Sequence, residues 1–193
     1  AGGLLASVVS YGAYGLRGEY FDGNDFAAKA LDRVDETIEF DWETGPPADG
    51  VGAREFSVRW TGTIRTAKTG RHVFHVIGTH SWRLRINGRL LVDVLSVKES
   101  GRAYDSAFKK IGMWERLTTS VIPLRANRRY DVVLEYAKIA QGAPSPARVK
   151  LVWVEPGCGA HVVPWFRLGP TPRGRAPQLA HRARDFYESI GVV

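Results

Sequence analysis

A polar corner, Gly78-Thr79-His80-Ser81, separates two apolar stretches of the chain and carries side chains suited to chemistry. His80 could ligate a transition metal, Thr79 and His80 together could bind a ligand, or the corner could simply turn the chain. The histidines just before it, His72 and His75, are three positions apart and point to opposite faces of a strand. Because no Cys or acidic cluster completes a ligand set, we expect no metal site. We favour a turn in which His80 bonds nearby backbone.

Arg83 and Arg85 alternate with apolar residues directly after the corner and therefore share one face of a predicted strand. Such a row is either an exposed polar face or an array of fork-shaped donors that binds carboxylates or phosphates of a partner. Trp114 and Trp165 lie in loop-like sequence and are candidates for a binding surface. The tryptophans in alternating strand patterns, which we expect in the core, are Trp42, Trp60, Trp82 and Trp153.

The acidic stretch 32–43 raises the question of hydrolase chemistry, in which two carboxylates act as acid and base across a cleft. No other feature indicates such a cleft. We therefore expect these acids to be solvated around a strand whose Ile38, Phe40 and Trp42 face inward. Cys158, the only Cys, cannot form an internal disulfide and has no base nearby in sequence. We expect no catalytic residue and no cofactor.

The net charge of +7 is unevenly distributed along the chain. Residues 1–62 carry 5 basic and 11 acidic side chains, a net of −6, whereas residues 80–130 carry 11 basic and 4 acidic ones, a net of +7. This polarity indicates one acidic and one basic surface, which suits oriented docking on a charged protein partner. Nucleic acid is disfavoured because the arginines alternate along strands instead of forming a recognition helix or a zinc module.

Alternation with a period of two dominates the middle of the chain and predicts strands. Asn87-Gly88 lies between two such stretches and predicts a tight hairpin turn. Since no alternation of strands and helices suggests a parallel sheet, we expect an antiparallel sandwich or barrel. The clearest alternating stretches are residues 56–60, 71–77, 82–93, 130–136 and 149–153.

The two ends differ from the middle, which gives three expected parts. Residues 1–14 are apolar and uncharged, as in an edge strand, a processed signal or the end of a trimmed membrane anchor. Residues 15–169 are the expected β-sandwich. Residues 170–193 form a basic linker followed by an amphipathic helix, whose apolar stripe includes Phe186 and Tyr187. That stripe must be covered by the domain itself or by a partner.

Motifs in the order found here resemble those of the protective-antigen domain family. They include "GLRGEYFDGNDF" at 15–26, "RLRINGRLLVD" at 83–93 and "IPLRANRRYDVVLEY" at 122–136. The resemblance implies an all-β fold, an antiparallel two-sheet β-sandwich without catalytic chemistry, to which this chain adds a short C-terminal helix. It also implies a binding or spacer role, which in several members is directed at carbohydrates.

The resemblance further implies a position for a calcium site. In sugar-binding members, two adjacent aspartates before the hairpin hold a calcium ion that bridges to sugar hydroxyls. Here Thr79 and His80 occupy those positions, and Ser81 replaces the glycine that usually follows. Threonine offers one neutral oxygen, and an imidazole nitrogen is a poor ligand for calcium. We therefore expect no calcium at this corner.

Two functions remain open from the sequence. The favoured one is a non-catalytic structural or docking module that contacts protein partners outside the cytoplasm, in the periplasm or extracellularly. An extrinsic subunit of a membrane-bound complex is one form that such a membrane-associated module could take. The alternative is a calcium-independent carbohydrate-binding module, such as an accessory domain of a larger glycan-processing protein.

Overall fold

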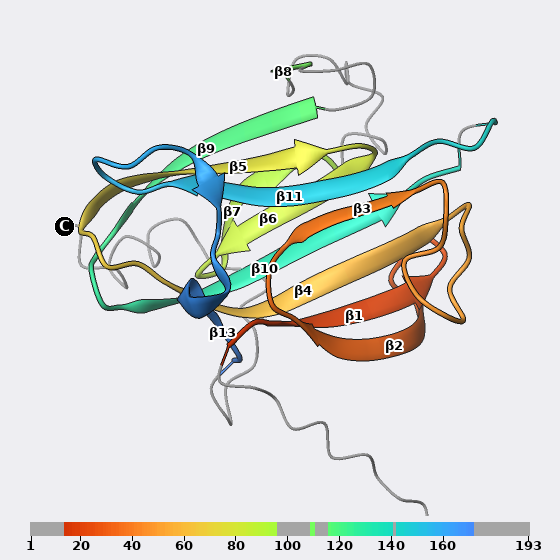
Figure 1. Ribbon diagram of the computed structural model, residues 1–193, viewed down its shortest axis with the longest axis horizontal. Coiled ribbons are helices and arrows are strands. Elements are labelled where there is room, and N and C mark those ends of the chain that lie inside the picture. Colours follow the sequence, from red (N-terminus) through yellow and green to blue (C-terminus); the bar gives the residue numbers. More distant parts are fainter. Residues whose placement is uncertain (1–13, 96–108, 111–115, 141, 172–193) are drawn as a thin grey trace, which may run out of the picture.

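The computed structural model describes residues 14–95, 109–110, 116–140 and 142–171 (Figure 1). Three of the predicted binding residues, Trp114, Phe186 and Tyr187, lie outside these ranges. The expected C-terminal helix and nearly all of the apolar N-terminal segment lie outside them as well. No helix in the described ranges has the length and hydrophobicity needed to cross a membrane.

The described chain folds into two antiparallel sheets that form a sandwich (Figure 1), which confirms the expected fold class. Sheet A has the order β2-β1-β4-β10-β6-β7, with β13 paired to β4, and sheet B has the order β12-β11-β5-β9-β8, with β3 paired to β11. Sheet A comprises β1 (Leu16–Asp22), β2 (Ala28–Asp35), β4 (Phe56–Arg65), β6 (Ser81–Ile86), β7 (Arg89–Asp93), β10 (Arg129–Lys138) and β13 (Leu168–Gly169). Sheet B comprises β3 (Glu39–Glu43), β5 (Gly70–Gly78), β8 (Lys109–Lys110), β9 (Arg116–Leu124), β11 (Ala147–Val154) and β12 (His161–Val162). A short 3-10 helix, η2 (Trp165–Arg167), precedes β13.

The core lies between the sheets and is rich in aromatic rings. Trp60, Trp82 and Trp153 are fully buried, and the partly buried Trp42 stacks on Trp60 at the edge of the core. Their burial removes large apolar areas from water and is a main source of the stability of the sandwich. Strand β10 contributes Tyr130, Val132, Leu134 and Tyr136 to this core, as its alternating sequence predicts.

Local turn chemistry explains how neighbouring strands are joined. Between β6 and β7, Asn87 and Gly88 have φ angles of 50° and 76°, as the primed hairpin turn requires. The acidic stretch forms two strands, β2 and β3, in place of the single strand expected.

Asp35, at the end of β2, is a buried carboxylate that joins three strands of sheet A. It accepts hydrogen bonds from the hydroxyl of Tyr20 (2.6 Å), from Nε1 of Trp60 (2.7 Å) and from Nε of Arg33 (2.7 Å). The expectation that the acids of this stretch are solvated is wrong for Asp35, which is 6% exposed. Burial, together with the charge of Asp35, raises the pKa of Tyr20, which therefore stays a hydrogen-bond donor.

Replacing Asp35 with Asn should destabilise the domain by about 2–4 kcal/mol, because three donors then point at a neutral amide that can satisfy only part of them. Urea unfolding measures the change. The control is Glu36→Gln, since Glu36 is the exposed neighbour and its change should stay within about 0.5 kcal/mol. Equal effects of the two substitutions would contradict the role assigned to Asp35.

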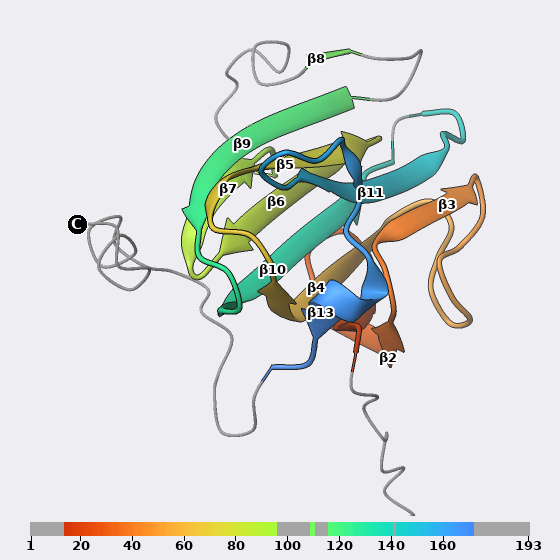
Figure 2. The ribbon, with the colours of Figure 1, turned by 60° about the vertical axis from the view of Figure 1, so that its left-hand side comes forward.

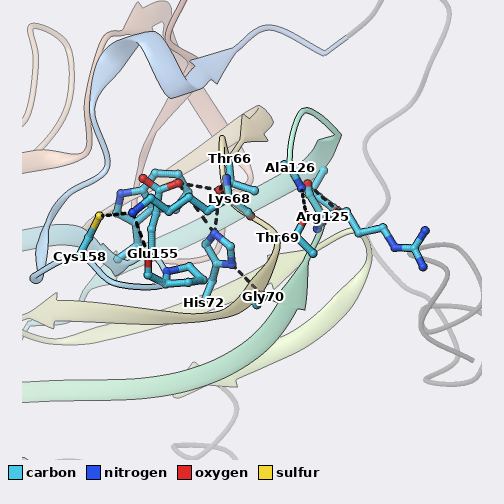
Figure 3. Close-up of polar contacts among 12 residues, drawn as sticks. Thr66, Lys68, Thr69, Gly70, His72, Arg125, Ala126, Glu155 and Cys158 are labelled. Atoms are coloured by element: carbon cyan, nitrogen blue, oxygen red, sulfur yellow. Dashed lines mark hydrogen bonds and ion pairs between the residues drawn. The ribbon is translucent and has the colours of Figure 1, made fainter.

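A second buried polar cluster, at one end of the sandwich, joins Thr66 after β4, His72 of β5 and Glu155 after β11 (Figure 3). The Thr66 hydroxyl donates to Oε1 of Glu155 (2.6 Å) and lies 2.8 Å from Nε2 of His72. The other ring nitrogen of His72, Nδ1, lies 3.0 Å from the carbonyl of Gly70. Burial lowers the pKa of His72, and the opposing effects of the Gly70 carbonyl and Glu155 only partly offset it.

Next to this cluster, Lys68 ties the loop after β11 to the rest of the domain. Its Nζ donates to the Pro156 carbonyl (2.9 Å) and to Sγ of Cys158 (3.1 Å). Figure 3 shows Lys68 reaching across to Cys158 beside the Thr66 cluster. Cys158 is therefore a half-buried loop thiol with a lysine partner.

The lowered pKa of His72 predicts that the domain loses stability in mild acid. The folded pKa lies below the unfolded value of 6.5, so protonation favours the unfolded chain. The contribution is fully present above pH 6.5 and is lost as the pH falls from there toward the folded pKa. His72→Gln, which does not titrate, should flatten the dependence of the unfolding free energy on pH between about pH 5 and 6.5. His75→Gln, at a partly exposed site, is the control and should flatten it less.

Candidate binding sites

The polar corner is the place where the chain crosses from one sheet to the other. Strand β5 of sheet B ends at Gly78 and β6 of sheet A begins at Ser81, so only Thr79 and His80 make the crossing. His80 adopts the left-handed region, with a φ of 64°. At Gly78 a Cβ atom would lie 2.4 Å from the carbonyl oxygen of Arg148, so glycine is required there. The tight crossing between the sheets therefore explains why glycine occupies position 78.

Thr79 and His80 bind the residues that lead into β11. The Thr79 hydroxyl donates to the carbonyl of Pro146 (2.8 Å) and accepts from the amide of Arg148 (3.0 Å). Nε2 of His80 lies 3.2 Å from the same Pro146 carbonyl, which can only accept, so this nitrogen carries the proton. The prediction that His80 is a turn residue bonded to nearby backbone is confirmed.

The corner offers no carboxylate, and the Thr79 oxygen is already engaged by protein groups. Thr79 and His80 are also buried, at 3% and 8% exposed. Across the described ranges, no three His, Cys, Asp or Glu side chains come together as a possible metal site. The geometry therefore points to a structural role for the two corner residues themselves.

A pocket of about 290 Å³ borders the loop that the corner holds, since residues 142–145 of this loop line it. Ser145 connects the two, because its hydroxyl lies 3.4 Å from Nε2 of His80 and its residue lines the pocket. The corner thus supports one wall of a hollow of ligand size. The lining residues that bear on its chemistry are Thr44, Arg54, Lys138, Ala143, Pro144 and Ser145.

Lys138 is the functional candidate that sequence reasoning missed. It follows Tyr136 at the next core-facing position of β10, is 2% exposed and lines the pocket. Its Nζ lies 5.8 Å from the centre of the Phe56 ring, and burial lowers its pKa. The signal was in the sequence, since the alternation from Tyr130 to Tyr136 continues to this lysine.

The arginine row of β6 is paired within the domain. Arg83 lies 3.0 Å from Asp93 and 3.5 Å from Glu135, and Arg85 lies 3.4 Å from the same Glu135 oxygen. Arg59 of β4 lies 2.9 Å from the second oxygen of Glu135. Three guanidinium groups therefore surround one carboxylate that is 6% exposed. These pairs stabilise the outer face of sheet A, and the capture of a partner's anions by Arg83 and Arg85 stays a prediction.

An exposed aromatic cluster, called the end patch here, lies where the described chain begins and ends. It consists of Tyr14, Trp165 and Phe166, which are 47%, 47% and 51% exposed. The Trp165 ring meets Tyr14 edge-on at 4.9 Å and Phe166 edge-on at 5.7 Å between ring centres. Trp165 is thus a surface residue, as its loop-like sequence predicted.

Backbone pairing holds the end patch in place. The amide of Gly15 donates to the carbonyl of Leu168 (3.2 Å), and β13 pairs with β4. Figures 1 and 2 both show β13 beside the start of β1. Three arginines, Arg65, Arg129 and Arg167, line a shallow hollow of about 200 Å³ next to the patch.

The pocket and the end patch lie at opposite ends of the sandwich. Strands β4 and β10 pair in antiparallel register along their whole length, with Phe56 opposite Lys138 and Arg65 opposite Arg129. The first pair is at the pocket and the second at the patch. Ten residues of strand at about 3.3 Å each place the two sites roughly 30 Å apart.

Comparison with known proteins places this geometry in a family. A model of the PA14 domain matches residues 12–164. Anti-sigma-I factor RsgI3 of Acetivibrio thermocellus is 28% identical over 164 residues, which cover 85% of this chain and 22% of that protein. A solved anti-sigma factor domain-containing protein is 29% identical with a TM-score of 0.69, over 86% of this chain and 50% of the other. The PA14 sugar-binding domain from RTX adhesin is 13% identical with a TM-score of 0.58, over 82% and 99%.

The extent of these matches differs between the relatives. The chain spans 22% of RsgI3, so the likeness concerns a part of that protein. The likeness to the adhesin domain, at 13% identity, shows the fold alone. The family model, in contrast, covers nearly all of the described sandwich from Tyr14 to Pro164. This chain therefore belongs to the PA14 domain family.

Proposed function

We propose that this domain is a non-catalytic docking module that binds a protein partner through the end patch. The single observation that carries the proposal is the clustering of three exposed aromatic side chains beside three arginines. Aromatic residues and arginine are the types enriched in protein interfaces, and they supply most of the binding energy there. The relatives named as anti-sigma factors support a role in protein contacts.

The position of the end patch supports docking through the chain ends as well. The chain continues beyond Tyr14 into an uncharged apolar segment and beyond residue 171 into the basic tail with Phe186 and Tyr187. Both continuations start at the patch, because Gly15 and Leu168 are hydrogen-bonded. A partner that covers the patch therefore lies beside the points where both continuations leave the described domain. We infer a location outside the cytoplasm and attachment to a membrane-associated assembly, in which the domain is an extrinsic subunit.

The combined substitution of Trp165 and Phe166 with Ala should release the domain from its native partner, with at least tenfold less co-purification. Removing two exposed aromatic anchors from an interface costs several kcal/mol of binding and little folding stability. The measurement is quantitative mass spectrometry of the complex isolated under mild conditions from the source cells. Leu90→Ala, at another exposed apolar residue, is the matched control and should leave the complex intact. Retention of the partner by the double variant would refute the proposed surface.

Calcium-independent carbohydrate binding is the second candidate function, and the pocket beside the corner favours it. Its volume of about 290 Å³ suits a small ligand, and hydroxyls of Thr44 and Ser145 line it. The adhesin relative is named as a sugar-binding PA14 domain, which supports this candidate. In this chain the corner serves the pocket by holding its wall, because Thr79 and His80 bond the loop itself.

The corner residues should support the fold without calcium. Thr79→Val removes the hydroxyl that donates to the Pro146 carbonyl and accepts from the Arg148 amide, and should destabilise the domain by about 1–3 kcal/mol. Millimolar calcium should not shift the thermal unfolding midpoint of the unaltered protein relative to a chelator. Differential scanning calorimetry measures both effects. Stabilisation by calcium that Thr79→Val abolishes would show that the corner is a metal site after all.

A further inference from the structure

We propose that the pocket beside the corner binds a sugar acid, with Lys138 as the cation that receives its carboxylate. The inference goes beyond docking through the end patch, which lies at the other end of the sandwich. It rests on the carbohydrate-binding candidate only for the hydroxyl-bearing part of the ligand. The burial of Lys138 and the residues that line the pocket support the assignment of a carboxylate ligand.

Lys138 is a cation that the described part of the domain does not pair. Within the described ranges, no hydrogen bond or ion pair engages its Nζ, and the centre of the Phe56 ring lies 5.8 Å away. The residue as a whole is 2% exposed and lines the pocket, whereas its Nζ is not one of the buried polar atoms that lack a partner, so the amine opens onto the hollow. Charges in such largely desolvated positions are usually paired in proteins. An anion in this hollow would give the amine an ion pair.

The acidic side chain next to Phe56 is engaged by groups other than Lys138. Glu55 precedes Phe56, whose register partner is Lys138. Its Oε1 accepts from Nδ2 of Asn24 (3.1 Å) and from the amide of Ala140 (3.2 Å). This carboxylate is therefore held by other donors and does not line the pocket. The pocket itself presents positive charge from Lys138 and Arg54.

The class of anion is inferred from the cation that the pocket buries. Lys138 supplies one buried positive charge, and a carboxylate carries one negative charge to balance it. Exposed Arg54 at the rim can add a fork-shaped donor to the same carboxylate. Thr44 and Ser145 offer hydroxyls for a polyol, and alanines and Pro144 form the apolar part of the wall. A volume of about 290 Å³ limits the ligand to a small molecule.

The test is calorimetric titration of the whole chain with D-glucuronate, D-glucose, D-glucuronamide and acetate. Glucuronate should bind saturably at one site. Glucose and the uncharged amide should bind at least tenfold more weakly, a difference of about 1.4 kcal/mol. Acetate, which has the carboxylate without the hydroxyls, should also bind at least tenfold more weakly.

Variants identify the cation. Lys138→Met should weaken glucuronate binding at least tenfold and should not lower the unfolding midpoint, because it removes a buried amine. Lys150→Met, at a lysine of β11 that pairs with Glu39, is the matched control and should leave binding unchanged. If Lys138→Met does not fold, the comparison of glucuronate with glucuronamide on the unaltered protein decides the question.

Several results would overturn the proposal. Equal binding of glucose would show a neutral carbohydrate site, and equal binding of acetate would show a carboxylate site without sugar selection. Equal weakening by Lys150→Met, or no binding of any of these ligands, would remove the role of Lys138. The Trp165 and Phe166 double variant should retain glucuronate binding, so failure of docking and failure of this inference are distinguishable.

Discussion

The crossing from sheet B to sheet A at Thr79 and His80 is the constraint on which the described architecture depends. Because only two residues make the crossing, their polar groups have few alternative positions. Each of these groups therefore needs a hydrogen-bond partner nearby. The segment before β11 supplies these partners, through Pro146 and Arg148. The same bonds fix the loop that forms the pocket wall. Thr79 and His80 thus connect the two sheets and also shape the adjacent pocket.

Two buried carboxylates of this domain have several partners each. Asp35 has three donors, and Glu135 has three guanidinium groups around it. Such fully satisfied groups fix the strands that supply their partners. Lys138 differs, because it is as deeply buried as these carboxylates but faces a hollow. The contrast explains why it is the residue to which we assign a ligand.

Much of the sandwich could be predicted from the sequence because strand alternation and the Asn87-Gly88 turn are local signals. The burial of Asp35 could not, since its donors Tyr20 and Trp60 come from other strands and nothing near it in sequence reveals them. For the same reason the sequence left open whether Arg83 and Arg85 form an exposed polar face or an array of donors for a partner. Pairing with Glu135 depends on strand order, which local patterns do not encode.

The corner was predicted in part. The lack of a metal-ligand set around His80 in the sequence favoured a turn, and the structure contains a turn there. Its function as a support for the pocket needed the loop before β11, which is remote in sequence. Trp165 was found because it lies in loop-like sequence, whereas its neighbours Tyr14 and Phe166 were missed. This cluster forms because the two ends of the described chain, near Gly15 and Leu168, lie side by side.

That meeting of the ends has a mechanical consequence. If the domain is held through the end patch, as we propose, its opposite end projects into the surrounding medium. That opposite end carries the hollow with Lys138, roughly 30 Å from the end patch. The proposed attachment and the proposed ligand binding then use separate surfaces, and the length of the strands sets the distance between them.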